Sequence, residues 1–127
     1  MNPIVLLDTN AILRFLLDDN HSQYLTVLET IKTRECYSIL SVVQEAVYVL
    51  EGYYNVPRSQ ISSLFLELKH IVQMEDEDIY TRAFEYYTET PKLDFADCLL
   101  CAYQALRSVD VLTFDKKLKH KLDSISD

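Results

Sequence analysis

Short apolar runs alternate along the chain with longer segments of helical periodicity. The short runs cover residues 4–7, 36–40, 71–74 and 109–112, and each has the length of a strand. A continuous apolar run such as Ile4–Leu7 is typical of a strand that is covered on both faces. Strands that alternate with helices indicate a parallel sheet between two helical layers. We therefore expect an α/β protein with a three-layer α/β/α fold and a central, mainly parallel sheet.

Between these runs, apolar residues recur at intervals of three and four, as they do in amphipathic helices. The expected helices cover residues 10–17, 24–31, 43–50, 57–68, 75–87 and 94–106, and a last one starts at residue 115. Asn10 is a good N-cap for the first helix, and Ser41–Gln44 has the pattern of a capping box. No linker or repeat interrupts the pattern, so residues 1–127 are expected to form a single domain.

The glycine content excludes several nucleotide-binding classes. Phosphate-binding loops and dinucleotide fingerprints need several glycines, because the backbone amides must approach the phosphates closely. This chain has one glycine, Gly52. No apolar run approaches the roughly 18 residues of a membrane span, and no basic stretch precedes an apolar one at the N-terminus. We therefore expect a cytoplasmic protein.

The three cysteines, Cys36, Cys98 and Cys101, are expected to be reduced. Cys98 and Cys101 have the CxxC spacing of redox and zinc motifs. Zinc would need two more such ligands, and a redox pair usually lies at an electropositive helix start, whereas this one follows two aspartates. Small buried apolar side chains are the better interpretation.

Four acidic residues occur at equivalent points of the predicted fold. Asp8 closes the first strand, and Glu45 lies one turn into the helix after the second strand. Asp97 lies in the first turn of a later helix, and Asp115 follows the last strand. Ligands of open parallel sheets bind beyond the carboxyl ends of the strands, which gives these side chains a reason to converge.

Converging carboxylates repel one another, and a hard divalent cation such as Mg²⁺ or Mn²⁺ relieves the repulsion because it prefers oxygen ligands. A water bound to such an ion can attack a phosphodiester, and a second ion about 3.5–4 Å away can stabilise the leaving oxygen. The sequence leaves open whether one ion or two are bound.

Each acid also has an ordinary structural explanation. Asp8 can belong to a turn in which Asn10 is the cap, and Glu45 can be a solvated helix residue. Asp97 suits a helix start because the helix dipole favours negative charge there, and Asp115 can cap the last helix. Singly, each of these explanations is preferred. Together, the four positions favour a common site.

Four motifs resemble the PIN-domain family, in particular the VapC toxin ribonucleases. They lie in order along almost the whole chain, at Leu6–Leu13, Ser41–Glu45, Asp94–Ala102 and Leu112–Lys116. The resemblance implies an endoribonuclease whose acidic pocket is formed by Asp8, Glu45, Asp97 and Asp115 with Mg²⁺ or Mn²⁺. It further implies an accessory acid, Asp94, and supporting hydrogen bonds from Asn10 and Thr113.

The resemblance also implies partners and has two departures. VapC-type proteins form homodimers and are silenced by a cognate VapB-type antitoxin, and their substrate is RNA. Family members usually carry small residues where Cys98 and Cys101 stand. Many continue into a fifth strand after the last helix, whereas residues 121–127 are short and polar here. The expected sheet therefore has four to five strands.

The formal net charge of −8 argues against a large electrostatic field that holds nucleic acid. The densest basic stretch includes Lys116, Lys117 and Lys119, directly after Asp115. It is either a solvated helix face or a guide for an RNA backbone, and the sequence leaves both open. Arg14 is a further candidate phosphate contact at the rim of the pocket.

Three other functions are compatible with parts of the pattern. A phospho-receiver domain has a similar size and acids at strand ends, but it needs a pair of acids after the first strand, which Leu7-Asp8-Thr9 does not supply. A PIN-like scaffold without catalysis is disfavoured by the intact acids. A PIN nuclease of RNA processing or decay would share the whole site with a toxin.

Overall fold

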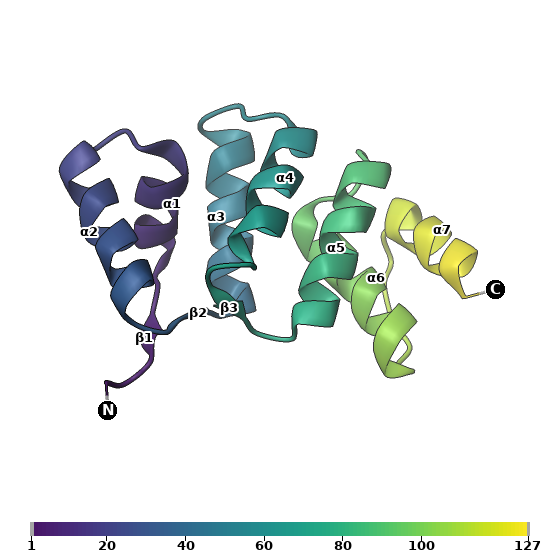
Figure 1. The fold of residues 1–127 in the computed structure, drawn as a ribbon. Helices are drawn as coiled ribbons and strands as arrows, with labels where there is room; N and C mark the ends of the chain where they lie inside the picture. The colour runs from purple at the N-terminus through teal and green to yellow at the C-terminus, as the bar shows by residue number, and fades with distance from the viewer. Residues whose placement is uncertain (1, 127) are drawn as a thin grey trace. The chain divides into compact units, whose positions relative to one another are not determined.

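The computed structural model describes residues 2–126 and divides the chain into two compact units, residues 1–75 and residues 76–127. Unit 1 contains β1 (Val5–Leu6), α1 (Thr9–Leu17), α2 (His21–Thr33), β2 (Cys36–Ser38), α3 (Leu40–Gly52), α4 (Arg58–Leu68) and β3 (Gln73–Met74). Unit 2 contains α5 (Glu77–Glu89), α6 (Phe95–Arg107) and α7 (Lys116–Ile125) (Figure 1). Each expected helix is present.

The sheet of unit 1 is parallel, as expected. Its order is β1-β2-β3, with Val5 opposite Cys36 and Ser38 opposite Met74. Hydrogen bonds outside the short ladders extend the pairing, since the amide of Leu7 donates to the carbonyl of Tyr37 at 3.0 Å. Within the described residues the sheet has three strands, so the expectation of four to five strands is wrong.

The strand expected at residues 109–112 is the missing one. This segment has no regular secondary structure, and no backbone hydrogen bond joins it to another strand within the described residues. A strand is stable only when a neighbour satisfies its amides and carbonyls. The described part of unit 2 contains helices and no strand, so the apolar run has no partner there.

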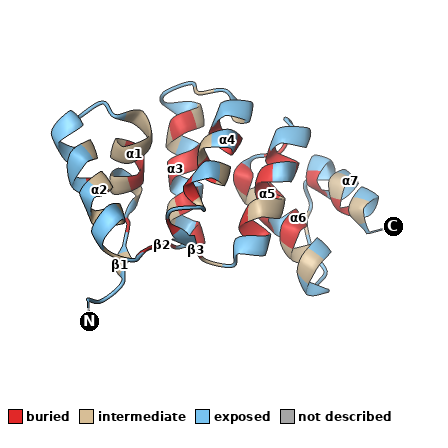
Figure 2. Ribbon diagram, viewed as in Figure 1, coloured by how far each residue is buried: buried red, intermediate tan, exposed pale blue. Residues whose placement is uncertain are grey.

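Helix packing in unit 1 follows the apolar stripes. Helix α1 packs against α2 and α3, and α3 packs against α4. Figure 2 shows buried positions along α3. They include Val43, Ala46, Val47 and Leu50, which recur at the three- and four-residue intervals of an amphipathic helix. The stripe thus decides the orientation of α3, because burying these side chains is the main gain of packing.

An aromatic cluster forms the core of unit 2. Phe84 is fully buried and lies 5.0 Å from Tyr80 and 4.5 Å from Phe95, measured between ring centroids. Tyr87 completes the cluster at 5.8 Å from Phe95. Tilted and edge-on rings at these separations attract one another beyond the gain from burial. The cluster therefore joins α5 to the first turn of α6.

The start of α3 differs from the expected capping box. The helix begins at Leu40, its N-cap Ile39 makes no side-chain capping bond, and Ser41 lies inside the first turn. Instead, the carboxylate of Glu75 accepts a hydrogen bond of 2.8 Å from the amide of Leu40. An acid that is distant in sequence thus satisfies one of the amides that a helix start leaves unpaired.

Asp78 and Arg107 join the start of α5 to the end of α6 by a two-pronged ion pair of 2.7 and 2.9 Å. The hydrogen bond from Arg107 lowers the pKa of the exposed Asp78 carboxyl from 3.8 to about 2. A carboxyl whose pKa is lower in the folded state stabilises the fold above pH 3.8, and the contribution is lost as the pH falls through 2.

We therefore expect Asp78→Asn to lower the unfolding temperature at pH 7, and we expect the difference from the parent to shrink as the pH falls toward 2. Circular dichroism melts across this range measure it. Glu77→Gln is the matched control, because it removes the same charge from the same turn of α5. An equal effect of both substitutions at every pH would contradict the role of the pair.

Candidate active site

Three of the candidate acids are N-caps. One carboxylate oxygen of Asp8 accepts from the amide of Ala11 at 2.8 Å, and one of Asp94 accepts from Asp97 at 2.9 Å. One of Asp115 accepts from the amides of residues 117 and 118 at 2.8 and 3.2 Å. The capping role of Asp115 is therefore confirmed, and Asp94 caps α6 in the same way. Each of these capping bonds is accepted by Oδ1, which orients the carboxylate.

The cap of the first helix is Asp8, so the assignment of this role to Asn10 is wrong. The helix begins one residue earlier than expected, at Thr9, and Asn10 lies exposed within its first turn. Aspartate and asparagine are about equally good caps, so the sequence alone favours neither of two neighbouring positions.

In unit 1, Asp8 and Glu45 belong to one surface. Thr9, which directly follows Asp8, donates a hydrogen bond of 3.1 Å from its hydroxyl to Oε2 of Glu45. This contact joins the first turn of α1 to α3, and both acids are exposed. The sequence analysis did not single out Thr9, because its partner lies 36 positions away.

In unit 2, Asp94, Asp97 and Asp115 form a second acidic group at the N-terminal ends of α6 and α7. Burial is the largest cause that raises the pKa of the Asp97 carboxyl, and the negative charges of Asp94 and Asp115 raise it further. Thr113 accepts a hydrogen bond of 3.0 Å from the amide of Asp115, so its hydroxyl supports the turn into α7.

The chemistry of these side chains fits a hard cation, because every donor is a carboxylate oxygen. A cation would also relieve the electrostatic repulsion between Asp97 and the two neighbouring acids, Asp94 and Asp115. By themselves, residues 2–126 contain no group of three or more His, Cys, Asp or Glu side chains that is arranged to hold a metal ion. The pocket of four acids stays a prediction.

A family comparison assigns the chain. The sequence model of the PIN domain matches residues 5–122. The chain belongs to the PIN-domain family. No curated protein and no solved structure matches it. PIN domains are generally nucleases that use divalent metals, so membership gives this chain a nuclease-type function and suggests an RNA substrate.

The four candidate RNA contacts of this PIN domain differ in their exposure and in their ion pairs. Lys116 and Lys117 are exposed in the first turn of α7, and Lys119 forms an exposed ion pair of 3.4 Å with Asp123. Arg14 is largely covered and forms an ion pair of 3.1 Å with Asp19. Of the four candidate RNA contacts, Lys116 and Lys117 are therefore the most accessible to a ligand.

The cysteines of this PIN domain are free and buried, as expected. Burial is the main cause that raises the pKa of the Cys101 thiol to about 11. Such a thiol stays protonated at neutral pH, whereas redox and zinc chemistry need the thiolate. Cys98 and Cys101 thus serve as small apolar side chains on the inner face of α6.

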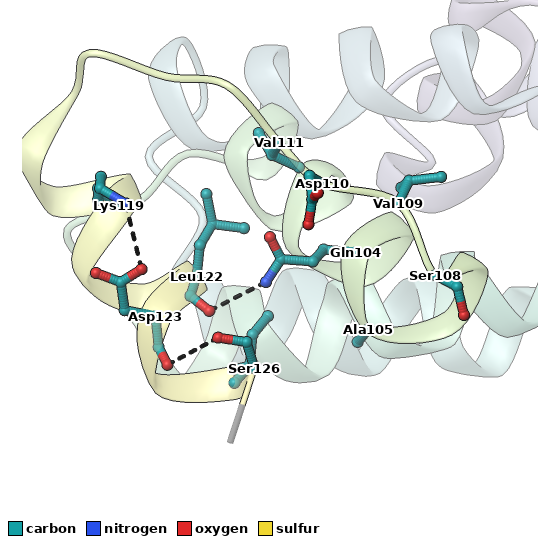
Figure 3. A pocket seen from close by; sticks show the side chains of 11 residues that line it. Gln104, Ala105, Ser108, Val109, Asp110, Val111, Lys119, Leu122, Asp123 and Ser126 are labelled. Atoms are coloured by element: carbon teal, nitrogen blue, oxygen red, sulfur yellow. Dashed lines mark hydrogen bonds and ion pairs between the residues drawn. The ribbon is translucent and has the colours of Figure 1, made fainter.

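One hollow of unit 2 has a volume of about 620 Å³ and lies between the end of α6, residues 108–111 and α7 (Figure 3). Gln104 spans it by a hydrogen bond of 3.0 Å to the carbonyl of Leu122. The ion pair of Lys119 with Asp123 lies at its rim. Neither Asp94, Asp97 nor Asp115 lines this hollow, so we do not place catalysis there.

No helix formed by the described residues has the length and apolar character that a bilayer crossing requires.

Proposed function

We propose that this chain is a Mg²⁺- or Mn²⁺-dependent endoribonuclease that acts in the cytoplasm as the toxin of a VapBC-type pair. The observation that carries the proposal is the acidic group at the starts of α6 and α7, in a chain of the PIN family. A partly buried acid close to two further acids lowers the stability of the fold, and such costs are typical of functional sites.

The proposed ligands are Asp8, Glu45, Asp97 and Asp115. Bound Mg²⁺ or Mn²⁺ would supply an activated water and stabilise charge on the phosphate. The chain itself orients the carboxylates. The amide of Ala11 fixes Asp8, and the hydroxyl of Thr9 fixes Glu45.

Asp115 is oriented from both sides. The amides of residues 117 and 118, in the first turn of α7, donate to Oδ1 of Asp115. The backbone amide of Asp115 in turn donates to the hydroxyl of Thr113. In this proposal Asp94 is the accessory acid that orients the first turn of α6, and Asn10 is a supporting residue on α1. Carboxylates that are already fixed lose little freedom when they bind a ligand, which favours tight positioning.

We assign contacts with the RNA backbone to Arg14, Lys116, Lys117 and Lys119. The net charge of −8 argues against a strong overall attraction to RNA, so we expect binding to depend on local cations. Lys116 and Lys117 follow Asp115 directly and are exposed, which leaves both ammonium groups accessible to a phosphate.

The toxin role rests on the VapC-like segment Asp94–Ala102, and it implies a homodimer and a VapB-type antitoxin as partners. A nuclease of RNA processing or decay would share the site but not the partner. Co-expression separates the two. For a toxin, we expect a small neighbouring reading frame that encodes a DNA-binding protein. On co-expression, its product should form a complex with this chain and abolish cleavage.

Metal removal tests the proposed activity. We expect the purified chain to cleave RNA in Mn²⁺, to stop in excess EDTA and to recover when Mn²⁺ is restored. Calorimetry should show uptake of Mn²⁺ by the same preparation. Unchanged cleavage in EDTA would exclude the mechanism. No uptake of Mn²⁺ and no cleavage would favour a scaffold without catalysis.

A further inference from the structure

Phe114 is the most exposed large apolar side chain among the described residues, with 95% of its surface accessible. The backbone on either side of it is nevertheless fixed. Thr113 accepts from the amide of Asp115, and Oδ1 of Asp115 accepts from the amides of residues 117 and 118. The ring therefore stands on an anchored turn, and little backbone freedom is lost when a ligand covers it.

A hollow of about 280 Å³ adjoins this ring. Residues 113–116 line it together with Lys119, His120 and Asp123. Its volume lies near the lower end of the roughly 300–1,000 Å³ of small-molecule sites, which suits a group the size of one nucleotide. An aromatic ring, nearby cations and the carboxylate of Asp115 thus share one surface of unit 2.

We propose that Phe114 stacks on an unpaired base of single-stranded RNA whose backbone lies against Lys116 and Lys119. The inference rests on the proposed function, because it places the base beside Asp115. Proteins read single-stranded RNA by stacking splayed bases on aromatic rings, while a duplex keeps its bases paired and covered. The substrate class is therefore a loop or a single strand.

The composition of the hollow favours a nucleotide over an apolar protein segment. A protein interface needs a contiguous apolar patch, and Leu112, which is exposed two positions before Phe114, does not line the hollow. Here Lys116, Lys119 and His120 surround the ring. The ion pair of Lys119 with Asp123 is exposed and therefore weak, so Lys119 can exchange it for a phosphate. The charge of Asp115 would be offset by the proposed metal.

The test compares substitutions of Phe114 in the full chain that carries Asp97→Asn to prevent cleavage. The probe is fluorescent oligoadenylate of about 12 nucleotides, single-stranded or annealed to oligouridylate, in Mg²⁺. Phe114→Ala should weaken single-strand binding by about 5- to 100-fold, the range typical of one stacked base. Phe114→Tyr should restore it, Phe114→Leu should not, and duplex binding should not respond.

Leu112→Ala is the matched control, because Leu112 is 88% exposed on the same segment but does not line the hollow. It should bind like its parent. Parent-like binding by Phe114→Ala or Phe114→Leu, or no binding of oligoadenylate before substitution at position 114, would overturn the stacking proposal. Mn²⁺-dependent cleavage of a random RNA pool by the unmodified chain would then still support the nuclease, whereas its absence would overturn both.

Discussion

Replacing Asp8 with asparagine is expected to slow Mn²⁺-dependent RNA cleavage by about 100-fold or more and to leave the fold intact. The proposed loss is that of a negative metal ligand, which is worth several kcal/mol, and each 1.36 kcal/mol is a factor of ten in rate. The capping bond from the amide of Ala11, at 2.8 Å, can be kept by the asparagine oxygen. The measurements are a cleavage time course and a thermal melt.

Two further substitutions separate charge, cap and catalysis in this test. Asp18→Asn removes the same charge at the other end of α1, at a φ of 47° that asparagine tolerates, and should cleave like the parent. Asp8→Ala also removes the cap and should cost about 1 kcal/mol of stability in addition. Parent-like cleavage by Asp8→Asn, in a preparation without contaminating nuclease, would show that the site is assigned wrongly.

Helices could be predicted from the sequence because their determinants are local. The helical spacing predicts a buried face of α5 that contains Ile79, Ala83 and either Tyr86 or Tyr87, and the structure buries all of these side chains. Asp94 and Asp115 marked the starts of α6 and α7 correctly. Periodicity and capping act within a few residues, so a single chain contains the information that they need.

The strand at residues 109–112 could not be settled in this way. An apolar run indicates that a segment can be a strand, but the hydrogen bonds that make it one come from another segment. The same holds for the start of α3, where the amide of Leu40 is satisfied by Glu75, 35 positions away. In both cases the outcome depends on a partner distant in sequence. Among the described residues, no strand pairs with residues 109–112, whereas Glu75 binds the amide of Leu40.

The candidate site was predictable in residue type and not in contacts. Acids at strand ends and helix starts pointed to Asp8, Glu45, Asp97 and Asp115. The contact of Thr9 with Glu45 and the exposure of Phe114 depend on how the segments fold against each other. The chemistry of the site is therefore a prediction from the sequence, whereas contacts such as that of Thr9 with Glu45 are visible only in the structure.

The second large effect is expected at Asp97, the least exposed of the proposed ligands. Burial first, then Asp94 and Asp115, raise the pKa of its carboxyl above the ordinary value of 3.8. A carboxyl whose pKa is higher in the folded state lowers the stability as the pH rises from 3.8 through the raised pKa, and the penalty persists at neutral pH. The metal-free fold therefore bears a cost for keeping this charge.

Asp97→Asn should accordingly have opposite effects on activity and on stability. Cleavage in Mn²⁺ should fall by about 100-fold or more, because a proposed metal ligand is lost. In EDTA at pH 7 the variant should unfold at a higher temperature than the parent, and the difference should vanish below pH 3.8. Asp110→Asn, at an exposed acid of the same unit, should change neither quantity. If Asp97→Asn loses activity and also unfolds at a lower temperature in EDTA, Asp97 is a structural residue. A functional acid that is kept at a cost in stability must leave the fold more stable when its charge is removed.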